Sequence, residues 1–147
     1  MNGPPPAASG PNALPPGSIP PPWTGWARYL LLTTFRADGT PVATPVWFVV
    51  DGIHLLVWTG PDTGKVRRIR RTQRVAVAPC SIRGRPMAPA VPAAAALLGV
   101  DLAPQVETLI RRKYPVTKRG LEAFEALTRT VSRRPRGAME AIQIWFG

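Results

Sequence analysis

The sequence predicts a mainly β domain with flanking α-helices, and three observations support this class. Apolar segments of strand length follow one another between residues 29 and 80, and Asp51-Gly52 between two of them is a strong hairpin signal. From residue 102 to residue 131 the apolar positions change to helical spacing. Residues 138–146 then return to an apolar strand.

The first three strands are expected to form two hairpins. They occupy Tyr29–Phe35, Thr40–Val50 and Ile53–Trp58, joined by turns at Arg36–Gly39 and Asp51-Gly52. The second strand is apolar on both faces. Because a type I′ turn needs positive φ at its two central residues, Asp-Gly makes the third strand the antiparallel return of the second.

Three further strands are indicated by β-branched and apolar runs. The fourth is Val75–Cys80. Ala88–Leu98 is expected to be a fifth, and Pro89 and Pro92 place it at an edge or give it a bulge, since proline cannot donate to a ladder. Ala138–Phe146 is apolar on both faces, so it should close a barrel or lie in a subunit interface.

Helices are expected in three places. Asp62 is the predicted N-cap of a short helix whose buried stripe is Val66 and Ile69 and whose arginines lie outside. Two later helices are indicated by Leu102, Val106, Leu109 and Ile110, and by Leu121, Phe124, Leu127 and Val131.

We expect a disordered proline-rich leader at residues 1–22 and a single domain at residues 23–147. The leader is uncharged and has little apolar surface to bury. It also lacks the basic residues and apolar run of a secretory signal. No stretch reaches the roughly 18 apolar residues of a membrane span, and the single cysteine, Cys80, cannot form a disulfide within the chain. These features predict a cytoplasmic protein with no membrane partner.

The net charge of +11 indicates an anionic partner. No acidic residue lies between Asp62 and Asp101, an interval rich in arginine. Such a surface attracts phosphorylated cofactors or nucleic acid, or it is simply a solvated helix face. If the partner were single-stranded nucleic acid, Trp47, Trp58 and Trp145 would be its stacking platforms. We rank nucleic acid below a small molecule.

Residues 60–66 (GPDTGKV) resemble a nucleotide-binding phosphate loop only superficially. The glycines are one residue too close, and Val66 stands where a magnesium-binding hydroxyl is required, which excludes an NTPase. What remains is a helix N-terminus whose free N–H groups favour an anion. Thr59 and Thr63 supply hydroxyls there. Lys65 supplies a positive charge, and because lysine is rare in this arginine-rich chain, it is the first candidate for holding an anion.

The chain offers no side-chain group for catalysis, and catalytic residues remain unknown. His54, the only histidine, is expected to be solvated, and Cys80 to be a small buried hydrophobe. Together they cannot supply a metal site or a nucleophilic triad, so we expect neither. An enzyme built on this chain would need a cofactor to carry the chemistry.

The chain resembles the pyridoxamine-phosphate-oxidase-like split β-barrel superfamily in three segments: LLTTFRADGTPVATPVWFVVDG, VWTG and TGKVRRIRRTQRVAVAPC. More narrowly, it is similar to the actinobacterial subgroup that uses a deazaflavin, coenzyme F-420, in place of flavin mononucleotide (FMN). The resemblance is close over Tyr29–Pro86 and looser over Val106–Phe146. It implies a six-stranded antiparallel split β-barrel with flanking helices, and a homodimer with the cofactor in a groove at the subunit interface.

The resemblance also implies which residues hold the cofactor. The ring would lie against strand residues, in part through their backbone: Pro45, Val46, Trp47, Val57, Trp58 and Thr59. The phosphate and further anionic groups would be held by the helix and its start: Thr63, Gly64, Lys65, Val66, Arg68 and Arg71. Since the coenzyme carries a phosphate and a polycarboxylate tail, a wide basic surface suits it better than it suits FMN.

The implied function is that of an oxidoreductase transferring a hydride between the deazaflavin and a small conjugated organic substrate. Two alternatives stay open: an FMN- or tetrapyrrole-binding protein on the same barrel, and a basic β-barrel that binds nucleic acid.

Overall fold

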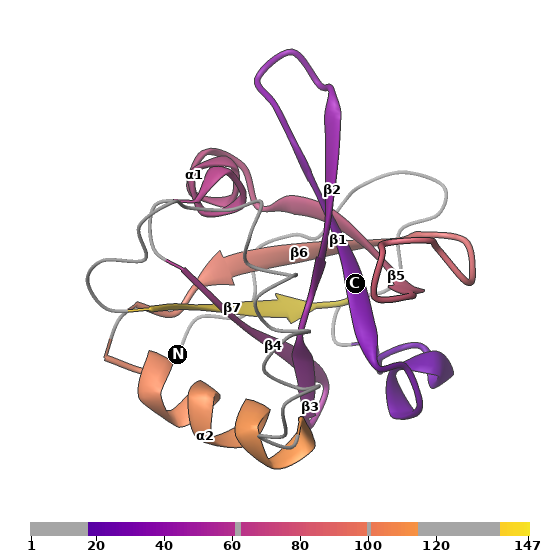
Figure 1. The fold of residues 1–147 in the computed structure, drawn as a ribbon. Helices are drawn as coiled ribbons and strands as arrows, with labels where there is room; N and C mark the ends of the chain where they lie inside the picture. The colour runs from indigo at the N-terminus through magenta and orange to yellow at the C-terminus, as the bar shows by residue number, and fades with distance from the viewer. Residues whose placement is uncertain (1–17, 61–62, 100, 115–138) are drawn as a thin grey trace.

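The computed structural model describes residues 18–60, 63–99, 101–114 and 139–147, which form one curled antiparallel sheet with helices against it (Figure 1). Its strands are β1 (Tyr29–Phe35), β2 (Pro41–Val46), β3 (Phe48–Asp51), β4 (His54–Thr59), β5 (Arg74–Cys80), β6 (Val91–Leu97) and β7 (Glu140–Trp145). The helices are the 3-10 helix η1 (Pro22–Gly25) and the α-helices α1 (Gly64–Arg71) and α2 (Ala103–Lys113).

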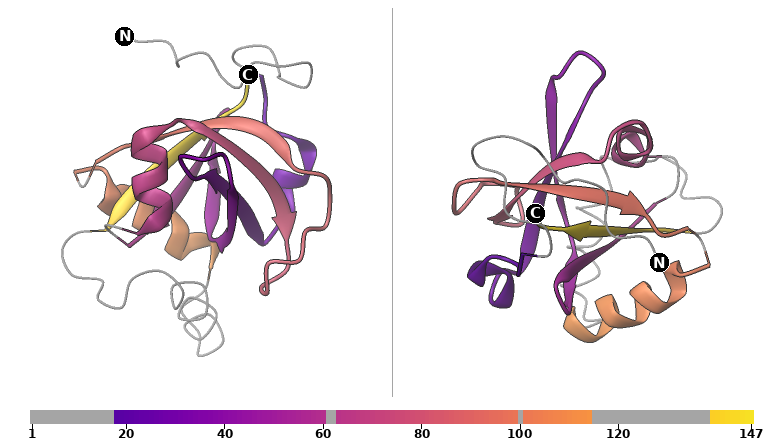
Figure 2. Two further views of the ribbon diagram at one scale, coloured as in Figure 1. Left: turned by 90° about the horizontal axis from the view of Figure 1, so that it is seen from above. Right: turned by 180° about the vertical axis from the view of Figure 1, so that it is seen from behind.

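The sheet curls because its two outermost strands are consecutive in the chain. The strand order is β2-β1-β5-β6-β7-β4-β3, so β2 and β3 stand at opposite ends although only Trp47 separates them. The chain from β2 to β3 pairs with β1 as far as Val46, and with β4 from Phe48 onward. Trp47 is therefore the point where the chain changes neighbours, and the sheet curls to bring both neighbours within reach (Figures 1 and 2).

This change of neighbours corrects one sequence-based expectation. The single strand predicted at Thr40–Val50 is two strands, β2 and β3, so the sheet has seven strands where six were expected. Because the segment is apolar on both faces, its local sequence contains no sign of the break.

Alternate strand residues fill the barrel interior. In β1 the inward residues are Leu30 and Leu32, and β4 and β7 contribute Val57 and Ile142, all with no exposed surface. Burying an aliphatic side chain of this size stabilises the fold by about 1.5–3 kcal/mol. Ile69 of α1 joins the same cluster, so α1 is anchored to the barrel interior.

Strand β6 is central in the sheet, so of the two effects predicted for Pro89 and Pro92, an edge position or a bulge, the edge position is wrong; Pro89 lies before the strand. The strand lies between β5 and β7. Pro92 pairs only with β5, opposite Ala76, because the pairing with β7 begins at Ala94. The side of Pro92 that would face β7 therefore has no ladder to interrupt.

Helix α1 begins one residue later than predicted. Its N-cap is Thr63, whose hydroxyl oxygen accepts the Val66 N–H at 3.4 Å. Asp62, the expected cap, lies outside the described residues. The buried face of the helix contains Val66 and Ile69, as predicted, and also Lys65.

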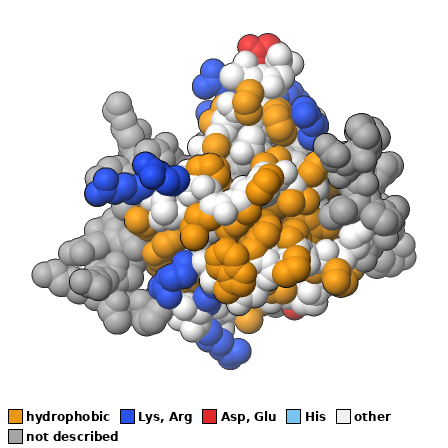
Figure 3. Space-filling model, turned by 90° about the vertical axis from the view of Figure 1, so that its right-hand side faces the viewer, with side chains coloured by type: hydrophobic (Ala, Val, Ile, Leu, Met, Phe, Trp, Pro, Cys, Tyr) orange, Lys and Arg blue, Asp and Glu red, His pale blue; other side chains and the backbone are white. Residues whose placement is uncertain are grey.

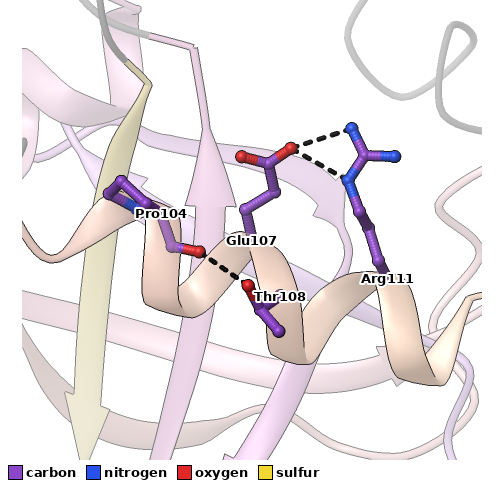
Figure 4. A network of polar contacts seen from close by, with 4 residues as sticks. All are labelled: Pro104, Glu107, Thr108 and Arg111. Atoms are coloured by element: carbon purple, nitrogen blue, oxygen red, sulfur yellow. Dashed lines mark hydrogen bonds and ion pairs between the residues drawn. The ribbon is translucent and has the colours of Figure 1, made fainter.

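Helix α2 packs on the outer face of the sheet, across β3, β4 and β7. Its Val106 and Ile110 are buried there. The opposite face is open to solvent, where Glu107 pairs with Arg111 at 2.8 Å and the Thr108 hydroxyl donates to the Pro104 carbonyl at 3.1 Å (Figure 4).

Some expectations fall outside the described residues. These are the helix predicted at residues 121–131 and residues 1–17 of the proposed leader. Ser18 is described and forms a β-bridge with Phe146. In the part of the chain that the structure covers, none of the helices has the length and hydropathy needed to cross a bilayer.

Candidate functional site

Most of the buried polar side chains among the described residues gather around the start of α1. They are Thr34, Thr59, Thr63, Lys65 and Glu140. Three structural links connect them. Arg68 of α1 donates from Nε to the Thr34 hydroxyl at 2.5 Å, and Thr59 ends β4 just before the helix. Glu140 is the cross-strand partner of Thr59, and its carboxylate accepts the Gly99 N–H at 2.9 Å. One end of the barrel is therefore polar, and α1 covers it. We call this set of residues the α1 end.

Lys65 is the central charge of the α1 end. Its side chain is only 2% exposed. Burial, and the nearby positive charge of Arg68, lower the pKa of Lys65 from its ordinary 10.5 to about 7. Among the described residues, the only ion pair joins Arg111 to Glu107 on α2. No carboxylate among them therefore neutralises Lys65. A buried charge without a counter-ion costs several kcal/mol, and a bound anion would offset that cost.

Of the predicted phosphate set, Gly64 and Arg68 lie together at the start of α1. A Cβ on Gly64 would lie 2.7 Å from a guanidinium nitrogen of Arg68, so the arginine folds back across the glycine. Desolvation, and then neighbouring arginines, lower the pKa of Arg68. The Arg71 guanidinium donates to the Phe35 carbonyl at the end of β1 and is exposed. Arg68 thus belongs to the α1 end, whereas Arg71 points to the β1–β2 hairpin.

The residues predicted to hold the ring do not share one face. Val46 and Val57 lie inside the barrel, and Val66 of the phosphate set is also buried. Only the backbone of these residues could meet a ligand. Trp47 and Trp58 lie on the outer face, packed against the cluster beneath α2.

Trp47 and Trp58 mark the place where the barrel splits. The β3–β4 pairing ends at Phe48 opposite Val57, so the next residues along, Trp47 and Trp58, stand where the two strands part. Pro45 lies apart from the two tryptophans. Its ring packs near Gly84, where an added Cβ would lie 3.6 Å from the Pro45 Cγ. The ring and phosphate sets therefore adjoin through Trp58 and Thr59, at the end of β4 that leads into α1.

Sequence reasoning missed three residues that the fold brings to these regions. Thr34 and Glu140 join the α1 end from strands distant in sequence. Tyr114, the residue after α2, stacks on the Trp47 indole with ring centroids 4.4 Å apart and planes inclined by 3°. Nothing in the local sequence marks these residues, because their roles depend on pairing register and on the docking of α2.

Residues 27–133 match the family model described as pyridoxamine 5'-phosphate oxidase. The chain belongs to this family. The curled antiparallel sheet with its two α-helices is the split barrel that the sequence resemblance implied, with seven strands in place of six. No curated protein sequence matches the chain.

Solved structures resemble the fold at low identity. An F420 reductase is 19% identical with a TM-score of 0.55, covering 88% of this chain and 96% of its own. An FMN-binding, pyridoxamine 5'-phosphate oxidase-related protein from Nostoc punctiforme is 17% identical with a TM-score of 0.50, covering 86% and 81%. The haem storage protein HutZ from Vibrio cholerae is 13% identical with a TM-score of 0.58, covering 85% of each chain. At these identities the likeness concerns the fold alone.

Proposed function

We propose that this protein is an oxidoreductase that binds coenzyme F-420 and transfers a hydride between it and a small conjugated organic substrate. The observation that carries the proposal is the buried ammonium of Lys65, held at a helix start without a carboxylate from the described residues. Family membership and the fold shared with an F420 reductase support a ring-and-phosphate cofactor.

The α1 end fits an anionic group. Lys65 offers an uncompensated positive charge, and the N-terminal N–H groups of α1 favour negative charge through the helix dipole. Thr59 and Thr63 add buried hydroxyls. We assign the coenzyme's phosphate to these residues and to Gly64. Arg68 would meet the first carboxylates of its tail, and Arg71, which lies outside the α1 end, would meet carboxylates farther along it.

The ring would lie where the barrel splits, beside Trp58 and the backbone of Pro45, Val46 and Trp47. The bound deazaflavin would supply the hydride chemistry, and the chain would supply orientation and exclusion of water. Because the interior valines are fully enclosed, the chain's contribution to ring binding comes from strand backbone and from the outer tryptophans.

We also propose a homodimer with the cofactor at its interface. Hydrophobic side chains gather on the face that carries η1 and the β5–β6 connection, with Lys and Arg at its margins (Figure 3). Trp26 and Met87, on these two elements, are each 60% exposed. A contiguous apolar surface of this kind is typical of an association site.

FMN is the second candidate cofactor. The same anion site would hold its phosphate, and a structural neighbour is an FMN-binding protein. The two cofactors differ in their tails, so the arginines outside the α1 end should distinguish them. Replacing Arg71 by methionine should weaken the deazaflavin more than FMN.

The test is a fluorescence titration of cofactor-free protein with coenzyme F-420, FMN and a short oligonucleotide at two salt concentrations. We expect micromolar or tighter binding of the coenzyme, weakened at least tenfold (about 1.4 kcal/mol) by Lys65→Ala. Arg70→Ala, which removes an exposed charge from the same helix, is the matched control. Binding of the oligonucleotide alone, with a steep salt dependence, would replace the proposal with nucleic-acid binding.

Turnover is tested separately by following oxidation of the bound, reduced coenzyme when enones or quinones are added. Binding without turnover on any acceptor would leave a carrier protein in place of an enzyme.

A further inference from the structure

The backbone of Phe48 is bonded by side chains at the end of α2. Phe48 is the first residue of β3. This strand stands at the edge of the sheet and pairs on one side only, with β4. The Phe48 N–H donates to the Tyr114 hydroxyl oxygen at 3.2 Å, and the Lys113 ammonium donates to the Phe48 carbonyl at 2.9 Å. The same ammonium lies 3.5 Å from the centroid of the Phe48 ring. Both polar backbone groups of this residue are therefore bonded from α2.

The Tyr114 hydroxyl also reaches the opposite side of the split. It donates its proton to the carbonyl of Arg28, the residue before β1. The pairing of β1 with β2 has already ended there, since its last pair is Leu30 with Val46. One hydroxyl thus connects the β1 side and the β3 side of the barrel across the gap that Trp47 spans.

The Tyr114 ring fixes Trp47 as well. The two rings are nearly parallel, and Tyr29 of β1 lies on the Tyr114 ring with centroids 6.2 Å apart. Tyr114 is 3% exposed, so the central ring of this stack is buried, whereas Tyr29 and Trp47 are half-buried. Contacts of this kind add about 0.5–1.5 kcal/mol beyond area burial.

We infer that Lys113 and Tyr114 are positioning residues for the ring-binding part of the site: from the end of α2 they hold the bend at Trp47 and so set the strand backbone that the ring would meet. This inference rests on the proposed function for its ligand. The bonds at Phe48 and the Trp47 stack are properties of the chain itself and are tested independently.

The experiment compares Tyr114→Phe and Lys113→Met with Arg112→Met, which removes an exposed charge from the same helix turn. Tyr114→Phe keeps the ring and removes only the hydroxyl. Each variant is titrated with coenzyme F-420 and with 5-deazariboflavin, a ring compound that lacks the phosphate. The near-ultraviolet circular dichroism of Trp47 is followed in parallel, with Trp47→Phe identifying its share of the spectrum.

We expect Tyr114→Phe and Lys113→Met to weaken both ligands by the same factor, about five- to tenfold, because each removes a hydrogen bond to the backbone of Phe48. Lys65→Met should instead weaken the coenzyme more than the ring compound. The Trp47 signal should fall in Tyr114→Phe and stay unchanged in Arg112→Met.

The inference is overturned if Tyr114→Phe leaves the Trp47 signal unchanged, or if it weakens only the phosphate-bearing ligand. Failure of the wild type to bind any ring compound would refute the proposed function. A reduced Trp47 signal in Tyr114→Phe would still show that the hydroxyl holds the bend.

Discussion

Two lysines are shielded from solvent in different parts of the molecule: Lys65 is buried at the α1 end, and Lys113, the last residue of α2, is half-buried. At the α1 end, Lys65 is buried, and Arg68 is its charged neighbour. At the end of α2, Lys113 donates to the Phe48 carbonyl and lies over the Phe48 ring. Burial lowers both pKa values, that of Lys65 to about 7 and that of Lys113 to about 8.

The difference indicates that Lys113 has a structural role, whereas Lys65 has a role in ligand binding. Lys113 has an acceptor and an aromatic face for its charge, so its burial is compensated within the chain. Lys65 forms no ion pair with a carboxylate among the described residues, and the helix dipole adds further positive potential. A charge held at a cost to stability points to function, and the following variants test that comparison.

The largest expected effect is a gain in stability from Lys65→Met. The difference between a pKa of 10.5 in the unfolded chain and about 7 in the folded one corresponds to roughly 5 kcal/mol below pH 7. Relieving it should raise the free energy of unfolding of the cofactor-free protein by about 2–5 kcal/mol at pH 6, measured by urea denaturation. Arg70→Met is the control and should change little.

The pH dependence of this gain has a definite sign. Because the folded pKa is lowered, the unfolded chain binds the Lys65 proton more strongly between about pH 7 and pH 10.5, and wild-type stability rises with pH there. The advantage of Lys65→Met should therefore be largest below pH 7 and shrink toward pH 10. An advantage that does not vary with pH would contradict the burial of a charged Lys65.

The next effect is a loss of stability from Tyr114→Phe. It removes the acceptor of the Phe48 N–H and the donor to the Arg28 carbonyl, which should cost about 1–3 kcal/mol in the free energy of unfolding. Tyr29→Phe, in the same aromatic stack, should cost less. If the two variants lost equal stability, the hydroxyl bridge across the split would have no special role.

The smallest effect is expected at the N-cap of α1. Thr63→Ala removes the oxygen that accepts the Val66 N–H and should destabilise the protein by about 0.5–1 kcal/mol. Thr63→Ser retains the hydroxyl and should stay close to wild type in a thermal melt. A loss in Thr63→Ser as large as in Thr63→Ala would assign the effect to packing of the methyl group.

Local sequence predicted most strands but not the place where they change partners. Alternation and the Asp51-Gly52 turn were enough to locate the hairpin of β3 and β4. The break at Trp47 was not predictable, because it depends on bonds from Lys113 and Tyr114 to Phe48, some 65 residues away in sequence. The central position of β6 likewise follows from the register that spares Pro92.

The candidate site was predictable where one segment supplies it. Thr63, Gly64 and Lys65 follow one another, and the scarcity of lysine made Lys65 prominent. Its near-complete burial was not foreseen, since the helix stripe was assigned to Val66 and Ile69 alone. Cys80 is buried as expected, and burial raises the pKa of its thiol to about 11, consistent with an inert side chain.

The most direct test of the central claim is the affinity of coenzyme F-420 for wild type and Lys65→Met between pH 6 and pH 9. If the anion binds the charged form of Lys65, wild-type affinity falls above pH 7 by up to about tenfold per pH unit, because binding must then take up a proton. Lys65→Met should bind weakly and without this dependence, so the difference between the two isolates Lys65. Parallel pH profiles for the two proteins would contradict an anion site at Lys65.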